Sequence, residues 1–336
     1  MSTTTRQAIL DYIRKHGSAT GPELADYLGI TRQAVNPHLR RLIADSEIAK
    51  TGSTKAARYF PYESAAAARV LKRKLELDGL DEADVYQQVA ISMTFTELHD
   101  SVESIVHYAF TEILNNAIDH SMAERCTIEV RSDATTVSFA IRDTGIGVFH
   151  SIADKFGLAN EQDAMIELIK GKTTTQPHAH SGEGLFFVSK AADRFTLRSH
   201  RLQIGWDKER GDVFVSEPRY LEGTLASFEI GKNSRTRLAN VFAEFAPEEY
   251  DFQFQKTRVQ VKLLRRDYVS RSEARRLLHN LDKFSEIELD MRDVKNVGQG
   301  FADEIFRVFA TAHPDISVRL RNANDAVAAM IRHVSG

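Results

Sequence analysis

The sequence predicts a multidomain protein in three parts: a mostly helical first domain with two short strands, an α+β domain in which helices cover a mixed sheet, and a small α/β domain. Three observations support this class. The 336 residues are too many for one ordinary hydrophobic core. A hydrophobic share of 42% and a charged share of 27% are those of a globular protein. Apolar residues follow helical spacing at the start and strand–helix alternation near the end.

Composition also restricts where the protein works. The one cysteine, Cys126, cannot form an internal disulfide, and it lies in an alternating apolar segment. We therefore expect a buried structural thiol and a reducing, cytoplasmic setting. The first residues lack the apolar core of a signal peptide. No apolar run approaches the roughly 20 residues that cross a bilayer, so we expect no membrane association.

Residues 1–62 contain three predicted helices followed by a pair of strands. Apolar residues recur with helical spacing through residues 4–44, and Gly29 makes a tight turn between the second and third helices. Thr31 is a good N-cap for the third helix, residues 32–44. Two short strands around a Gly-Ser tip follow. This order is the helix-turn-helix pattern with a wing.

The third helix carries polar and basic residues on its outer face. Residues 4–62 resemble the winged helix-turn-helix DNA-binding domains of bacterial regulators. They contain nine Lys and Arg against five Asp and Glu, a charge of +4 in a chain of net charge −3, which suits contact with phosphates. A winged helix used for protein contacts is the alternative. The resemblance implies DNA contacts from Arg32, Gln33, Asn36, Arg40, Arg41 and Lys55.

Residues 63–95 are rich in alanine and then in charged residues. They contain no recognisable catalytic or binding motif. We predict that they form a helical linker between the first domain and the second.

The stretch EILNNAIDHS places three polar side chains on one helix face. Glu112, Asn116 and His120 follow one another at intervals of four residues, which aligns them on a helix. Neighbouring apolar residues supply the buried stripe. A carboxylate, a carboxamide and an imidazole beside a core suggest a site for a metal and a phosphate.

Three further segments add to this pattern. Asp143-Thr-Gly-Ile-Gly147 follows a predicted strand, where a carboxylate can accept a hydrogen bond from an exocyclic amine. Ser181-Gly-Glu-Gly184 opens a helix, whose free N–H groups and dipole suit a phosphate. Gly223-Thr224 begins a strand that could close the sheet.

In this order and spacing, the four segments resemble the GHKL ATP-binding domain of gyrase B, MutL, histidine kinases and anti-sigma-factor kinases. The resemblance covers residues 96–231 and implies ATP and Mg²⁺ as ligands. Asn116 would hold Mg²⁺ against the phosphates, and Asp143 would receive the adenine amino group. Residues 172–180 would form the ATP lid. The implied nucleotide contacts are Asn116, Asp143, Gly145, Gly147, Gly182, Gly184 and Thr224.

The resemblance makes Glu112 the residue that decides the reaction. It occupies the place of the general base in family members that hydrolyse ATP or phosphorylate serine, and histidine kinases usually lack a carboxylate there. One departure from the family is His180, which stands at the first position of the GxGxG loop. A histidine stiffens the loop at that point, so we expect slow or partner-dependent turnover.

The C-terminal third is predicted to be a small α/β layer. Residues 232–250 form a connecting helix, and residues 251–336 alternate between strands and helices. The segment beginning at Ile287 resembles the central turn of STAS-like domains. In anti-sigma-factor antagonists of that family, a serine or threonine at this helix start is phosphorylated. Here Gly298-Gln299-Gly300 stands at that place, so we expect a domain kept for protein contacts.

These features favour an ATP-binding, DNA-binding transcriptional regulator or switch that slowly hydrolyses Mg-ATP. We expect a homodimer in which ATP changes the packing of the second and third domains and so repositions the winged helix. The alternative is a serine/threonine protein kinase of the anti-sigma-factor type, with Glu112 activating a partner's hydroxyl. A scaffold that binds ATP without turnover is the third possibility.

Overall fold

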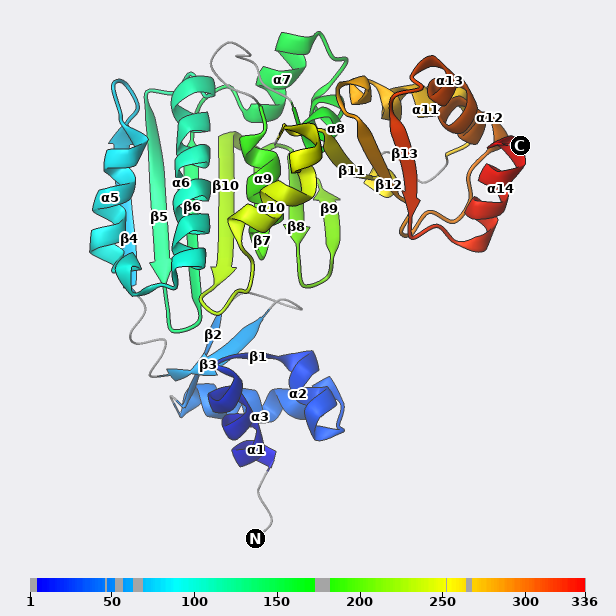
Figure 1. Ribbon diagram of the computed structural model, residues 1–336. Coiled ribbons are helices and arrows are strands. Elements are labelled where there is room, and N and C mark those ends of the chain that lie inside the picture. The colour runs from blue at the N-terminus through cyan, green and yellow to red at the C-terminus, as the bar shows by residue number, and fades with distance from the viewer. Residues whose placement is uncertain are drawn as a thin grey trace.

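The computed structural model describes residues 5–45, 47–51, 57–62, 69–172, 182–251, 253–263 and 268–335. Figure 1 shows three sheets: a small one near the N-terminus, a wide central one, and a third near the C-terminus. Within these residues, no helix is both long and apolar enough to cross a membrane.

The N-terminal domain matches the predicted helix-turn-helix with a wing. Its helices are α1 (Thr5–His16), α2 (Gly21–Leu28) and α3 (Arg32–Ala44), and its sheet contains β1 (Ala19–Thr20), β3 (Arg58–Pro61) and β2 (Ile48–Thr51). The Thr31 hydroxyl accepts a hydrogen bond from the Ala34 N–H at 3.2 Å. The predicted N-cap of the third helix is therefore confirmed.

The central sheet has seven strands, in the spatial order β4 (Arg69–Glu76), β5 (Arg125–Ser132), β6 (Thr136–Asp143), β10 (Leu221–Gly231), β7 (Arg194–His200), β8 (Leu202–Asp207) and β9 (Asp212–Ser216). Every neighbouring pair is antiparallel. The α+β class is confirmed, but the sheet is antiparallel where we predicted a mixed one. The reason is β10, which lies between β6 and β7 and separates these two parallel-running strands.

Helices cover one face of this sheet. They are α5 (Glu82–Met93), α6 (Asp100–His120), α9 (Gly184–Ala191) and α10 (Leu238–Phe245). The connection from β6 to β7 also contains α7 (Val148–Phe156) and α8 (Glu161–Lys170), which lie beside one end of the sheet in Figure 1. Short 3₁₀ turns occur at Phe95–Glu97, Glu248–Tyr250, Val261–Leu263 and Leu281–Lys283.

The prediction of a helix through residues 69–76 was wrong. These residues form the edge strand β4, with Leu71 opposite Val130 and Leu75 opposite Cys126. The segment RVLKRKLE contains good helix formers, which favoured the helical interpretation. It also alternates, because Leu71 and Leu75 pack against the core, and Arg73, on the same face, donates to Gln88 of α5, whereas Lys72 and Lys74 are exposed on the other face. Pairing with β5 decides between the two patterns.

The C-terminal sheet is parallel and small. Its order is β11 (Lys256–Gln260), β12 (Glu286–Asp290) and β13 (Ser317–Arg321). Its helices are α11 (Arg271–Leu278), α12 (Gln299–Asp303), which continues through a π-helical turn at Glu304–Phe309 into α13 (Ala310–Ala312), and α14 (Asp325–Ser335). The Ser270 hydroxyl caps α11 by accepting a hydrogen bond from the Glu273 N–H. The helix ends at Leu278, and Asn280, two residues further on, adopts a left-handed conformation that a helix cannot continue through.

Two hydrophobic cores explain how the three domains are joined. One cluster of buried apolar side chains runs without a break through the central and C-terminal domains. The N-terminal domain has a separate cluster. Cores that share side chains resist separation, whereas a domain with its own core can move as a unit.

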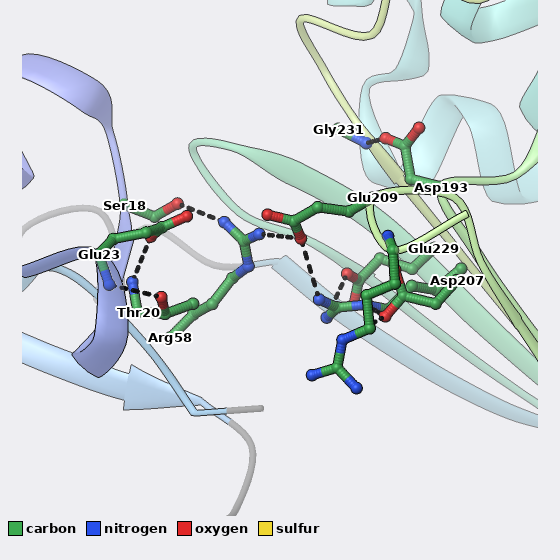
Figure 2. Close-up of polar contacts among 11 residues, drawn as sticks. Ser18, Thr20, Glu23, Arg58, Asp193, Asp207, Glu209, Glu229 and Gly231 are labelled. Atoms are coloured by element: carbon green, nitrogen blue, oxygen red, sulfur yellow. Dashed lines mark hydrogen bonds and ion pairs between the residues drawn. The ribbon is translucent and has the colours of Figure 1, made fainter. Parts of the chain in front are cut away.

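An ion pair between Arg58 and Glu209 connects the N-terminal domain to the central domain (Figure 2). Arg58 donates to the Ser18 hydroxyl at 3.3 Å and to Glu209 at 2.9 Å. Glu209 lies 3.5 Å from Arg194, which also lies 3.4 Å from Asp207. Exposed and half-exposed pairs of this kind contribute little free energy each. The junction is therefore polar and weak.

Candidate nucleotide-binding site

A cavity of about 290 Å³ lies where α6, α7, α8 and α9 meet β6 and β10. Its volume is close to the lower end of the range for small-molecule pockets, roughly 300–1,000 Å³. Six of the residues that the sequence assigned to a nucleotide or to catalysis line this cavity, and His120, the third polar residue of the same helix face, lines it too. The six are Glu112, Asn116, Asp143, Gly182, Gly184 and Thr224.

Helix α6 presents its polar row to this cavity. The apolar residues of α6 are buried against the sheet, which turns Glu112, Asn116 and His120 to the cavity side. The Asn116 side-chain nitrogen donates to the Glu112 carbonyl at 2.6 Å. Because that nitrogen is engaged by the helix, the amide oxygen is the atom of Asn116 suited to a cation.

Asp143 ends β6 and is only 4% exposed. Its Oδ1 accepts the N–H groups of Gly145 at 2.9 Å and Thr224 at 3.1 Å. Burial raises the pKa of Asp143, and these backbone hydrogen bonds oppose the rise. With Oδ1 engaged twice, Oδ2 is the oxygen suited to an exocyclic amine.

The loop after Asp143 is held against the end of α6. The Ile146 N–H donates to the Ser121 carbonyl at 2.9 Å, and a Cβ built on Gly145 would collide with that carbonyl. Only glycine allows this approach. Gly145 and Gly147 do not line the cavity. They belong to the loop that follows Asp143, and they allow this loop to pack closely beside the cavity. Ser121 is a lining residue that sequence reasoning did not assign, although it closes the EILNNAIDHS stretch.

Glu112 lies against the first turn of α9. A Cβ built on Gly184 would collide with Glu112 Oε2, so glycine is required for the carboxylate to lie there. The N-terminus of a helix attracts anions. Burial raises the pKa of the neighbouring Tyr108, and the charges of Glu112 and Glu183 raise it further. The catalytic candidate and the phosphate-binding candidate are thus adjacent.

The donor groups fit a nucleotide and a magnesium ion in different ways. The buried Asp143 carboxylate and the apolar side chains of Ile141 and Leu197 suit a purine. The Asn116 amide oxygen is a ligand type that Mg²⁺ accepts, and nucleotide phosphates supply others. Among the residues that the structure describes, no three His, Cys, Asp or Glu are grouped to hold a metal.

The predicted DNA-binding side chains are placed apart from this cavity. All those within α3 are exposed on that helix, as reading a DNA groove requires. Lys55 and lid residues 173–180 lie outside the described residues. Cys126 is buried as expected, and burial, with the charge of Asp143, raises its pKa to about 11. The exposed set is Arg32, Gln33, Asn36, Arg40 and Arg41.

Comparison with family models matches three segments of the chain. Residues 2–45 match a winged helix-turn-helix DNA-binding model, and residues 63–204 match the histidine kinase-like ATPase domain. Residues 273–328 match a STAS-like domain of unknown function. The chain carries all three domains. No curated protein matches it.

The predicted architecture is therefore confirmed, and the three domains can be named. The ATPase match begins at residue 63 and so includes β4 and α5. A winged helix supports DNA binding, and the ATPase domain supports nucleotide binding, in one chain.

The STAS-like domain contacts the same helix that lines the cavity. Leu168 of α8 lines the cavity, and Lys170 of α8 is 1% exposed. Lys170 Nζ lies 2.6 Å from Glu167 and donates to the His279 carbonyl, at the end of α11, at 2.8 Å. Asn280 donates to Glu167 at 2.9 Å. The nucleotide cavity and the STAS-like domain thus share α8.

Proposed function

We propose that this protein is an ATP-controlled DNA-binding transcriptional regulator whose ATPase domain binds and slowly hydrolyses Mg-ATP. One observation carries the proposal. Asp143, Asn116 and Glu112 surround a single cavity, in a chain whose α3 exposes a basic face.

The binding roles follow from the chemistry of each group. Asp143 Oδ2 accepts the adenine amine, since Oδ1 is held by two backbone N–H groups. Gly182 and Gly184 supply N–H groups to the phosphates at the start of α9. Asn116 holds Mg²⁺, which when bound neutralises negative charge on the phosphates.

Glu112 orients and deprotonates the attacking water. The carboxylate lies beside the first turn of α9, next to the N–H groups proposed to bind phosphate. A general base must be within hydrogen-bond reach of the proton that it removes, and this neighbourhood meets that requirement.

The weak junction of the winged helix is where nucleotide control acts. The ATPase and STAS-like domains share one hydrophobic core, whereas the winged helix has its own. This favours movement of the winged helix over a change in packing between the other two domains. Helix α9 runs from the phosphate end at Gly184 to Ala191, close in sequence to Arg194, which contacts Glu209 and through it Arg58.

Two expectations about association accompany the proposal. We infer that the protein is a homodimer, because regulators with winged helices read paired half-sites. We also infer that the STAS-like surface takes a protein partner in the cytoplasm. Light scattering of the purified chain tests the first, and a dilution-independent monomer mass would contradict it.

The deciding experiment compares DNA binding by wild type and Asp143→Asn, each with and without ATP and Mg²⁺. We expect ATP to change the DNA affinity of wild type and to have no effect on the variant. Asp154→Asn is the matched control, because Asp154 is exposed on α7. Nucleotide dependence that survives in Asp143→Asn would overturn the adenine-site assignment.

A serine/threonine kinase is the second candidate, and the position of Glu112 favours it equally. The same carboxylate would activate a partner's hydroxyl in place of water. Labelled ATP separates the two, because a kinase transfers label to protein and an ATPase releases it as phosphate. Full function in Glu112→Ala would support a scaffold that binds ATP without turnover.

A further inference from the structure

The face of the central sheet opposite its helices has no role in the proposed function so far. Figure 1 shows the helices on one face, and the side chains on the other face are mostly polar and partly exposed. In β6, Ile141 and Asp143 line the nucleotide cavity, whereas Arg142 between them is exposed on the other side. Antiparallel sheets often have one solvated face of this kind. We call it the open face.

One row of residues across the open face contains three cations and no acid. The strand registers place Lys74 of β4, Arg142 of β6 and Arg198 of β7 in one line, with Thr127 of β5 and Leu225 of β10 between them. Neighbouring strands lie about 4.8 Å apart, so the cations follow one another at intervals of about 10 Å. Like charges at this spacing repel each other, and a bound anion relieves that repulsion.

Carboxylates do not neutralise these three cations. Among the described residues, Lys74, Arg142 and Arg198 form no ion pair, and the buried Nε of Arg198 has no hydrogen-bond partner. Lys72 precedes Lys74 by two residues on the same face, and it is paired with Glu129 at 3.3 Å. The row therefore has positive charge to spare, which Lys72 does not.

A hollow of about 470 Å³ lies at the β4 end of the row. Lys74 and Arg142 line it together with Thr127 and Thr144, and the lining has three basic side chains against one acidic one. Lys, Arg and Thr side chains are among the groups through which proteins bind DNA phosphates. Protein interfaces instead need an apolar centre, and Leu225 is the single apolar residue of the row. The row therefore suits DNA better than an acidic protein.

The winged helix joins the central domain close to this row. Arg58 of β3 pairs with Glu209, and Glu209 pairs with Arg194 of β7 (Figure 2). Arg194 and Arg198 are four residues apart on the same face of β7, a distance of about 13 Å. One helical turn of DNA is about 34 Å long. The row thus lies within one turn of the place where the winged helix is attached.

We propose that Lys74, Arg142 and Arg198 bind the phosphates of duplex DNA that flanks the winged-helix site, and this rests on the proposed DNA-binding function. Arg142 and Asp143 are consecutive in β6 and lie on opposite faces, so the flanking DNA lies directly behind the nucleotide cavity. A lysine or arginine that neutralises a phosphate releases counterions, which makes binding depend steeply on salt.

The test measures DNA affinity against salt concentration by fluorescence anisotropy, without ATP. The probes are labelled duplexes of about 12 and about 24 base pairs, roughly one and two helical turns. With the longer duplex, Lys74→Gln combined with Arg142→Gln should reduce the slope of log affinity against log salt by about 2, or about 1 for each lost phosphate contact. With the shorter duplex, which the winged helix alone covers, the slope should equal that of wild type.

Lys155→Gln combined with Lys295→Gln is the matched control. It removes the same charge from two exposed positions, one on α7 and one in the STAS-like domain, so its slope should equal that of wild type with both duplexes. Lys74→Arg combined with Arg142→Lys keeps both charges, and it should also bind as wild type does.

An unchanged slope in Lys74→Gln with Arg142→Gln on the longer duplex would overturn the inference, as would an equal loss in the control. A loss of the same size with both duplexes would overturn it too, because flanking DNA would not be its cause. If the row bound poly-glutamate and not DNA, its partner would be an acidic protein and the inference would fail. Absence of DNA binding by wild type with both duplexes would instead overturn the proposed function.

Discussion

Replacing Lys170 by methionine should unfold the joined ATPase and STAS-like core much more easily. Lys170 and Glu167 are 1% and 6% exposed, and their charged atoms are 2.6 Å apart. Burial lowers the pKa of Lys170, and the charge of Glu167 opposes this. Removing the lysine leaves a buried carboxylate without its cation. Breaking a buried pair in this way costs about 3–5 kcal/mol.

That cost is a large part of the roughly 5–15 kcal/mol by which folded proteins are stable. The assay is urea unfolding followed by circular dichroism and by the fluorescence of Trp206, which lies in the shared core. We expect a lower midpoint for this core and no change in the separate winged-helix transition. The double variant Glu167→Leu with Lys170→Met should recover most of the loss, because it leaves no unpaired charge.

Lys72→Met is the matched control. Lys72 and Glu129 form a pair at 3.3 Å, but their side chains are 67% and 56% exposed. An exposed pair contributes about 0–1 kcal/mol, so this variant should unfold almost as wild type does. A cost for Lys170→Met no greater than that of Lys72→Met would refute a stabilising role for this buried ion pair in the joined core.

Three further predictions concern the nucleotide and DNA sites. In Gly184→Ala the new Cβ would collide with Glu112 and displace the N–H group proposed to bind phosphate. Losing one hydrogen bond to a charged group should lower ATP affinity about 10-fold or more. An unchanged affinity measured by calorimetry would contradict this. Burial raises the pKa of Asp143, and its carboxylate must be ionised to accept the adenine amine, so ATP affinity should fall as the pH drops through that raised pKa. The dependence of ATP affinity on pH should be flatter in Asp143→Asn. Identical pH dependence in the two proteins would contradict the assignment of Asp143 to the adenine amine. Glu209→Gln removes the charged partner of Arg58 and should free the winged helix. DNA affinity in the absence of ATP, measured by fluorescence anisotropy, should rise about 2- to 5-fold. Equal affinity in wild type and variant would show that this contact does not restrain the winged helix.

The features that the sequence determined by itself are local ones. Glu112, Asn116 and His120 face one side because a helix repeats every 3.6 residues, and this holds wherever the helix packs. Thr31 caps α3 because its hydroxyl reaches an N–H three residues along. The segment around Asp143 ends a strand for a similarly short-range reason. The resemblances that rest on these patterns predicted the three domains, and six of the residues that they assigned to a nucleotide or to catalysis line the cavity.

Tertiary structure decided whatever depends on a distant partner. Residues 69–76 have both helical and strand character, and only pairing with β5 makes them the edge strand. Asp143 and Thr224 are 81 residues apart in the sequence, and they become neighbours because β10 pairs with β6. Lys170 is buried because a helix from another domain ends over it. Long-range contacts depend on where the chain returns, and no local spacing contains that information.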